Sequence, residues 1–144
     1  MDDAGLSNML REDRAEWNAL VAVLDAHPGE ALHGGTSVWV SRDVYAHLAR
    51  WMEHSTADLQ ARLEDLTLPP LSGTEDEINA RWQQADSVLS FAAARERAHA
   101  IFERRLRAIQ AVPPARWSDK ILEAMARADG TNHYRAHRSY IVLG

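Results

Sequence analysis

Apolar residues recur along the chain with the spacing of amphipathic α-helices. In the first segment they fall three, four or seven positions apart, at Leu6, Leu10, Trp17, Leu20, Val21 and Leu24. This period places them on one face of a helix, with charged residues opposite. We predict a first helix over about residues 5–26, which ends at the helix-breaking sequence His27-Pro28-Gly29.

Two longer patterns follow. Ser41 is a suitable N-cap for a second helix, which ends near Leu66. Thr74 and Glu77 form a capping box that begins a third helix. Its apolar stripe continues without interruption to about Ala111, so the pattern predicts one long helix there.

The end of the chain divides into a short helix and a last helix. Ser118 is the expected N-cap of the short helix, and Asp129-Gly130 marks its end. The last helix begins at Thr131 or Asn132 and runs toward Ile141 or Val142. Helix lengths and connections of this kind are typical of an all-α antiparallel four-helix bundle, here with a short extra helix before the last helix.

The remaining patterns point to a single domain. Ser37 to Val40 is the only short stretch with strand character, and it is not part of a longer alternating pattern. No internal repeat or low-complexity tract divides the chain. We therefore expect residues 1–144 to form one bundle domain.

The net charge and the distribution of apolar residues limit the classes of partner that the chain is expected to bind. The 144 residues carry 16 Lys and Arg against 21 Asp and Glu, a net charge of -5 that disfavours nucleic-acid binding. We interpret the local run of arginines as a solvated helix face; it comprises Arg95, Arg97, Arg104, Arg105 and Arg107. No stretch approaches the roughly 18 apolar residues of a membrane span, and the acidic start does not resemble a signal peptide. The expectation is a soluble cytoplasmic protein.

The chain has no cysteine and seven histidines. The lack of cysteine excludes a thiolate nucleophile, a CxxC pair, an iron–sulfur cluster and a cysteine zinc site. Any metal must therefore be held by His, Asp or Glu. His133 and His137 lie four residues apart, on one face of the last helix, where two imidazoles can bind one cation. The pair alone is a weak signal, because solvated histidines at this spacing are common.

A third histidine strengthens the prediction of a metal site at this pair. His47 lies on or beside the inward stripe of the second helix, and bundles build metal sites from inward side chains of facing helices. Three nitrogen ligands leave a coordination position open for water or substrate. Trp51, His54 and Tyr140 are candidates to line a pocket at this site, although core packing of the aromatic residues and a boundary position for His54 are the simpler alternatives.

Two motifs carry a family resemblance. The segment Ser41-Arg42-Asp43-Val44-Tyr45-Ala46-His47-Leu48-Ala49-Arg50-Trp51 and the later Asn132-His133-Tyr134-Arg135-Ala136-His137 resemble the DinB-like superfamily of bacterial four-helix bundles, and most closely its ClbS/DfsB family. The resemblance covers nearly the whole chain. The resemblance implies a nickel or zinc site on His47, His133 and His137. It also implies one of two functions: an enzyme that uses a low-molecular-weight thiol, or a protein that protects the cell from reactive small molecules.

Three functions remain open. The first is a metal-dependent S-transferase or hydrolase, in which the metal activates water or a thiol cosubstrate toward a small electrophilic substrate. The second is a metal-free protein of the ClbS type that binds a small molecule and confers self-resistance. The third is a helical scaffold whose role is homodimerisation, and a homodimer is expected in any of the three.

Overall fold

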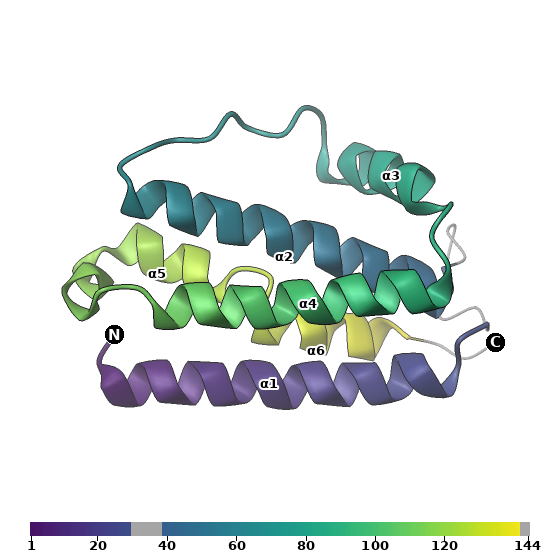
Figure 1. Cartoon of the computed structure of the whole chain (residues 1–144), viewed down its shortest axis with the longest axis horizontal. Helices are drawn as coiled ribbons and strands as arrows, with labels where there is room; N and C mark the ends of the chain where they lie inside the picture. The colour runs from purple at the N-terminus through teal and green to yellow at the C-terminus, as the bar shows by residue number, and fades with distance from the viewer. Residues whose placement is uncertain (30–38, 142–144) are drawn as a thin grey trace.

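The computed structural model describes residues 1–29 and 39–141, together with every side chain in those ranges except that of Tyr140 (Figure 1). Its elements in chain order are α1 (Asp3–Ala26), α2 (Ser41–Leu63), α3 (Glu75–Asp86), α4 (Phe91–Gln110), the 3₁₀ turn η1 (Pro114–Ser118), α5 (Lys120–Arg127) and α6 (Thr131–Tyr140). The all-α prediction is confirmed, because the described ranges contain no β-strand. Within those ranges, no helix has both the length and the apolar character needed to cross a membrane.

The candidate strand and the start of α2 lie beside the gap in the described ranges. Residues 37 and 38 of the strand candidate lie outside the described residues, and Trp39 and Val40 precede α2 without strand structure. Val40, rather than Ser41, is the N-cap residue of α2. The Ser41 hydroxyl instead donates a 2.7 Å hydrogen bond to the Leu24 carbonyl and so ties the end of α1 to α2.

The long helices run in two directions. Figure 1 shows α1 and α6 running one way and α2 and α4 running the other. The ring contact between Tyr45 and Phe91, near the starts of α2 and α4, agrees with this arrangement. The chain therefore does not reverse at every long helix, as a simple antiparallel bundle would. The extended connection after α2, together with α3, returns the chain so that α4 can lie alongside α2 in the same direction.

The predicted long third helix is wrong, because the segment forms two helices. The Thr74 capping box begins α3 as expected, but α3 ends at Asp86. Ser90 then caps α4 by accepting a 3.0 Å hydrogen bond from the Ala93 amide. Leu89, in the turn between the helices, packs against the core, so the apolar period continues through the break and conceals it. Asp119, one residue after the predicted cap, is the N-cap of α5.

The core between the long helices anchors α6. The Trp17 indole of α1 stacks on Phe102 of α4 with ring centroids 4.7 Å apart, and its edge meets Tyr134 of α6. Tyr134 is fully buried, and its hydroxyl lies 3.1 Å from the sulfur of Met52 on α2. Since Tyr134 lies next to His133 in the sequence, this packing fixes the part of α6 that carries the predicted ligands.

Candidate metal centre

The three predicted ligands meet at one point. His47 comes from α2, and His133 and His137 come from successive turns of α6. The Nε2 atom of His137 lies 3.0 Å from the Nε2 of His47 and 3.0 Å from the Nε2 of His133. One ligand atom from each ring falls within 4.8 Å of the others, and the His137 side chain is buried.

This arrangement is compatible with a divalent metal site. Zinc binds imidazole nitrogen at about 2.0–2.1 Å, so two ligands in a tetrahedral shell are about 3.3 Å apart. The two 3.0 Å separations are close to that value. An all-nitrogen donor set favours zinc or nickel over magnesium and calcium, which prefer oxygen. Three ligands also leave a coordination position for water or substrate.

The protonation state of His133 suits a ligand. Burial, and to a smaller extent the positive charge of Arg105, lower the pKa of His133 to about 4. The ring is therefore neutral at pH 7, which is the form that binds a metal. Burial thus removes the proton competition that an exposed imidazole would offer.

Asp129 touches the far side of the His133 ring. Its Oδ1 atom lies 3.3 Å from His133 Nδ1. Burial raises the pKa of Asp129 to about 6, while a hydrogen bond with Ser55 and the charge of Arg105 act in the opposite direction. The sequence predicts Asp129 only as part of a helix end; its position four residues before His133 is the signal that indicates the contact.

A buried ion pair fixes the start of α6. Arg105 on α4 donates from Nη1 to Asp13 Oδ2 on α1 at 2.7 Å, and both side chains are 2% exposed. Its Nη2 donates to the Ala126 carbonyl of α5. Asp13 Oδ1 accepts hydrogen bonds from the backbone amide and the hydroxyl of Thr131, the first residue of α6. We call this group of Asp13, Arg105 and Thr131 the clamp.

The clamp corrects the prediction of a solvated arginine face at Arg105, whereas Arg104 and Arg107 are exposed as predicted. Arg105 lies in the core, where it pairs with Asp13. The two residues are 92 positions apart in the sequence, so only the fold brings them together. Burial of an arginine requires such a partner. Gly130 packs directly on the pair: a Cβ atom there would lie 2.5 Å from Arg105 Nη2 and 2.8 Å from Asp13 Oδ1. A side chain at residue 130 would therefore force Arg105 or Asp13 to shift.

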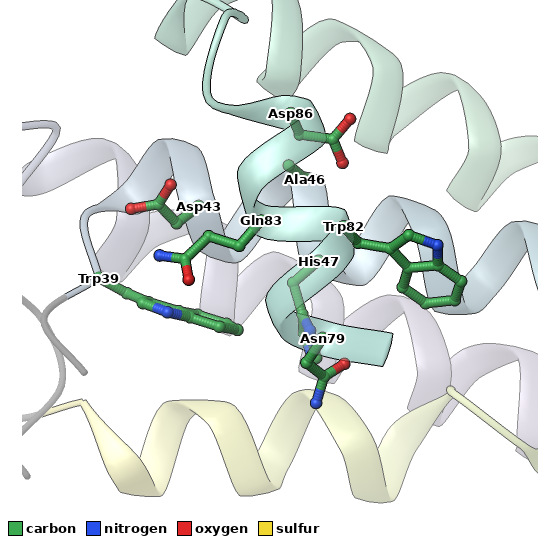
Figure 2. A pocket seen from close by; sticks show the side chains of 8 residues that line it. All are labelled: Trp39, Asp43, Ala46, His47, Asn79, Trp82, Gln83 and Asp86. Carbon is green, nitrogen blue, oxygen red and sulfur yellow. The ribbon is translucent and has the colours of Figure 1, made fainter. Parts of the chain in front are cut away.

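A small pocket adjoins His47 between α2 and α3 (Figure 2). Its lining consists of Trp39, Asp43, Ala46, His47, Asn79, Trp82, Gln83 and Asp86. The Trp51 indole donates a 2.8 Å hydrogen bond to Asn79 and holds α3 against α2. The Trp39 ring lies 5.0 Å from the His47 ring, measured between centroids. In Figure 2, His47 points from α2 past α3 toward α6, where its two partner histidines lie.

A larger pocket of about 400 Å³ adjoins His133. Its lining consists of Trp51, His54, Ser55, Asp58, Glu75, Ala128, Asp129 and His133. The structure thus places two of the predicted pocket residues, Trp51 and His54, on the wall of this cavity. The His54 Nε2 atom lies 3.3 Å from Asp58 Oδ2 and is not part of the three-nitrogen group. The side chain of Tyr140, the third predicted pocket residue, lies outside the described residues.

Comparisons of the chain with protein-family models, with curated proteins and with solved structures find no match. The resemblance to the DinB-like superfamily therefore stays a prediction. So do the expected homodimer and thiol cosubstrate. The three histidines and the pockets beside them are the candidate functional features of the described residues.

Proposed function

We propose that this chain is a metal-dependent protein of the DinB-like superfamily in which His47, His133 and His137 hold one zinc or nickel ion. The observation that carries the proposal is the convergence of three Nε2 atoms from two different helices. The all-helical fold supports it, since α2 packs against α4, α1 packs against α6, and the histidines lie between α2 and α6.

The site suits the activation of a nucleophile. A divalent metal with three nitrogen ligands lowers the pKa of a bound water or thiol and so supplies a nucleophile near neutral pH. Because the chain has no cysteine, a thiol would be a cosubstrate of low molecular weight. We propose thiol transfer to, or hydrolysis of, a small electrophilic substrate.

The chain's own residues would position that substrate. The 400 Å³ pocket has the size of small-molecule sites, and His133 forms part of its wall. The Trp51 indole offers an apolar surface, and Ser55 and Asp58 offer polar groups for orientation. Substrate in this pocket would therefore lie next to the three-histidine group.

A second candidate is a metal-free small-molecule binding protein of the ClbS type. The 400 Å³ pocket favours it, because Trp51, Ser55 and Asp58 can contact a ligand without any metal. This function predicts that a bound small molecule stabilises the protein equally in the presence and absence of a chelator. The metal-dependent function predicts that the chelator abolishes activity.

Metal content separates the two candidates. We expect untagged protein to contain close to one zinc or nickel ion per chain by elemental analysis, and His137→Ala to lose most of it. His27→Ala is the matched control, since His27 caps the end of α1 outside the three-nitrogen group. Substoichiometric metal that His137→Ala leaves unchanged, even after incubation with zinc and nickel salts, would contradict the metal-dependent function.

A further inference from the structure

We infer that Asp129 is a positioning residue of the metal centre, whose carboxylate orients the His133 ring so that Nε2 faces His47 and His137. The inference rests on the proposed metal site and deepens it. The two ring nitrogens of His133 have different neighbours: Nε2 lies 3.0 Å from His137 Nε2, whereas Nδ1 lies 3.3 Å from Asp129 Oδ1.

The Asp129 contact selects the tautomer that a metal requires. A carboxylate beside Nδ1 favours the proton on that nitrogen, which leaves the lone pair on Nε2 free to bind a cation. Metal-binding histidines commonly donate their second N–H to a carboxylate or a carbonyl in this way. Among the described residues, His133 Nδ1 is buried and has no partner with full hydrogen-bond geometry, and the Asp129 carboxylate lies 3.3 Å from it.

The backbone at Asp129 supports a role for its side chain. Its φ is +57°, in the left-handed region that glycine adopts without cost and that other residues adopt less readily. An aspartate at such a position gains from a side-chain contact that glycine could not make. Asp65, at the end of α2, has nearly the same φ of +58° but is exposed and distant in sequence from the histidines, so it provides a matched comparison.

The clamp holds this carboxylate in place. The next residue, Gly130, packs against Arg105 and Asp13, and the amide of Thr131 donates to Asp13 at 2.8 Å. The backbone that follows Asp129 is therefore fixed by α1 and α4, independently of the histidines. Asp129 thus links a rigid part of the fold to the orientation of one ligand ring.

The experiment separates the side chain from the backbone. Asp129→Gly keeps the positive φ and removes the carboxylate, whereas Asp129→Asn keeps the size and an acceptor oxygen but removes the charge. We expect Asp129→Gly to bind zinc about 10–100-fold more weakly in competition with a chromophoric chelator, with Asp129→Asn between it and the wild type. We also expect the visible absorption spectrum of bound cobalt to change in Asp129→Gly.

Three controls make the outcome decisive. Asp65→Gly and Asp65→Asn should leave zinc affinity unchanged, and the metal-free Asp129 variants should melt close to the wild type. If Asp129→Gly does not fold, Asp129→Asn decides. Zinc affinity within twofold of wild type in the folded Asp129 variants would overturn the positioning role while leaving the metal site intact. A wild-type protein that binds no zinc would overturn both.

Discussion

Two groups of polar side chains meet at α6, and they differ in how their atoms are paired. The clamp joins opposite charges, because the Arg105 guanidinium lies against the Asp13 carboxylate and both have further hydrogen-bond partners. The histidine group instead brings identical atoms together, since the Nε2 atoms of three imidazoles converge on one another. Both groups are largely removed from water.

This difference in pairing distinguishes the clamp, a structural group, from the histidine group, a candidate ligand-binding group. The clamp is complete within the chain and needs no added group. In the histidine group, a single Nε2 atom of His137 cannot donate to one neighbour and accept from the other at the same time. A cation bound by all three lone pairs satisfies the three nitrogens together. The same fold thus contains one group that fixes α6 and one, formed partly by α6, whose geometry is compatible with a metal site.

The largest expected effect concerns the clamp. Arg105→Met leaves the Asp13 carboxylate buried without its counter-charge, and we expect it to lower the free energy of unfolding by about 3–5 kcal/mol. Arg104→Met, next to it, removes only the exposed ion pair with Glu53 and should cost less than about 1 kcal/mol. Urea unfolding of both variants measures the difference, and equal losses would contradict the structural role of the clamp.

The histidine group should respond to metal instead. We expect zinc at about 100 times its dissociation constant to stabilise the wild type by about 2.7 kcal/mol, because only the folded chain brings the three rings together. His47→Ala should abolish this stabilisation. It should change the metal-free protein much less than Arg105→Met does. Thermal unfolding with and without zinc tests both statements, and equal zinc stabilisation of wild type and His47→Ala would contradict them.

Gly130 tests how tightly the clamp is packed. Gly130→Ala forces a Cβ atom against Arg105 and Asp13, and we expect a loss of about 1–3 kcal/mol. Gly29→Ala is the control, since a Cβ atom at residue 29 meets no atom of residues 1–29 or 39–141 within 4 Å. Chemical denaturation of both variants gives the comparison. A tolerated alanine at residue 130 would show that the clamp can move aside.

A smaller effect concerns the ion pair of Asp86 with Arg50, beside the His47 pocket. Burial alone would raise the pKa of Asp86, but hydrogen bonds and charges from Arg50 and Arg97 outweigh it and lower the pKa below its ordinary value of 3.8. A lowered pKa stabilises the folded state above the unfolded value, and this contribution disappears as the pH falls through the folded value.

We therefore expect Asp86→Asn to cost about 1 kcal/mol at pH 7 and progressively less below about pH 4. Urea unfolding of the variant and the wild type at pH 7, 5 and 3 measures this cost. A cost that is the same at pH 3 and pH 7 would show that Asp86 acts through packing rather than through its charge. In either case zinc binding should be unchanged, which keeps this ion pair apart from the histidine group.

Local sequence patterns predicted most of the helices and the grouping of the three histidines. The features that these patterns missed depend on tertiary contacts. The break at Ser90 was hidden because Leu89 continues the apolar period through the turn. The burial of Arg105 could not be predicted, because its partner Asp13 lies on another helix. The contact of Asp129 with His133 could have been predicted from the sequence, since the two residues are only four positions apart.

The direction of the helices was also beyond local patterns. The predicted connections suggested reversal at each long helix, whereas α2 and α4 run the same way. The ion pair of Arg50 with Asp86 and the hydrogen bond of Trp51 with Asn79 hold α3 across α2, and both pairings join residues far apart in the chain. Spacing places residues on a helix face, but only packing decides which faces meet.

We propose above that three imidazoles hold one divalent metal ion through Nε2. Diffraction from crystals of the zinc-loaded protein, recorded at the zinc absorption edge, tests it most directly. We expect one anomalous peak per chain, about 2.0–2.1 Å from the Nε2 atoms of His47, His133 and His137. Absence of a peak between these rings, with zinc found only on surface carboxylates, would contradict the claim.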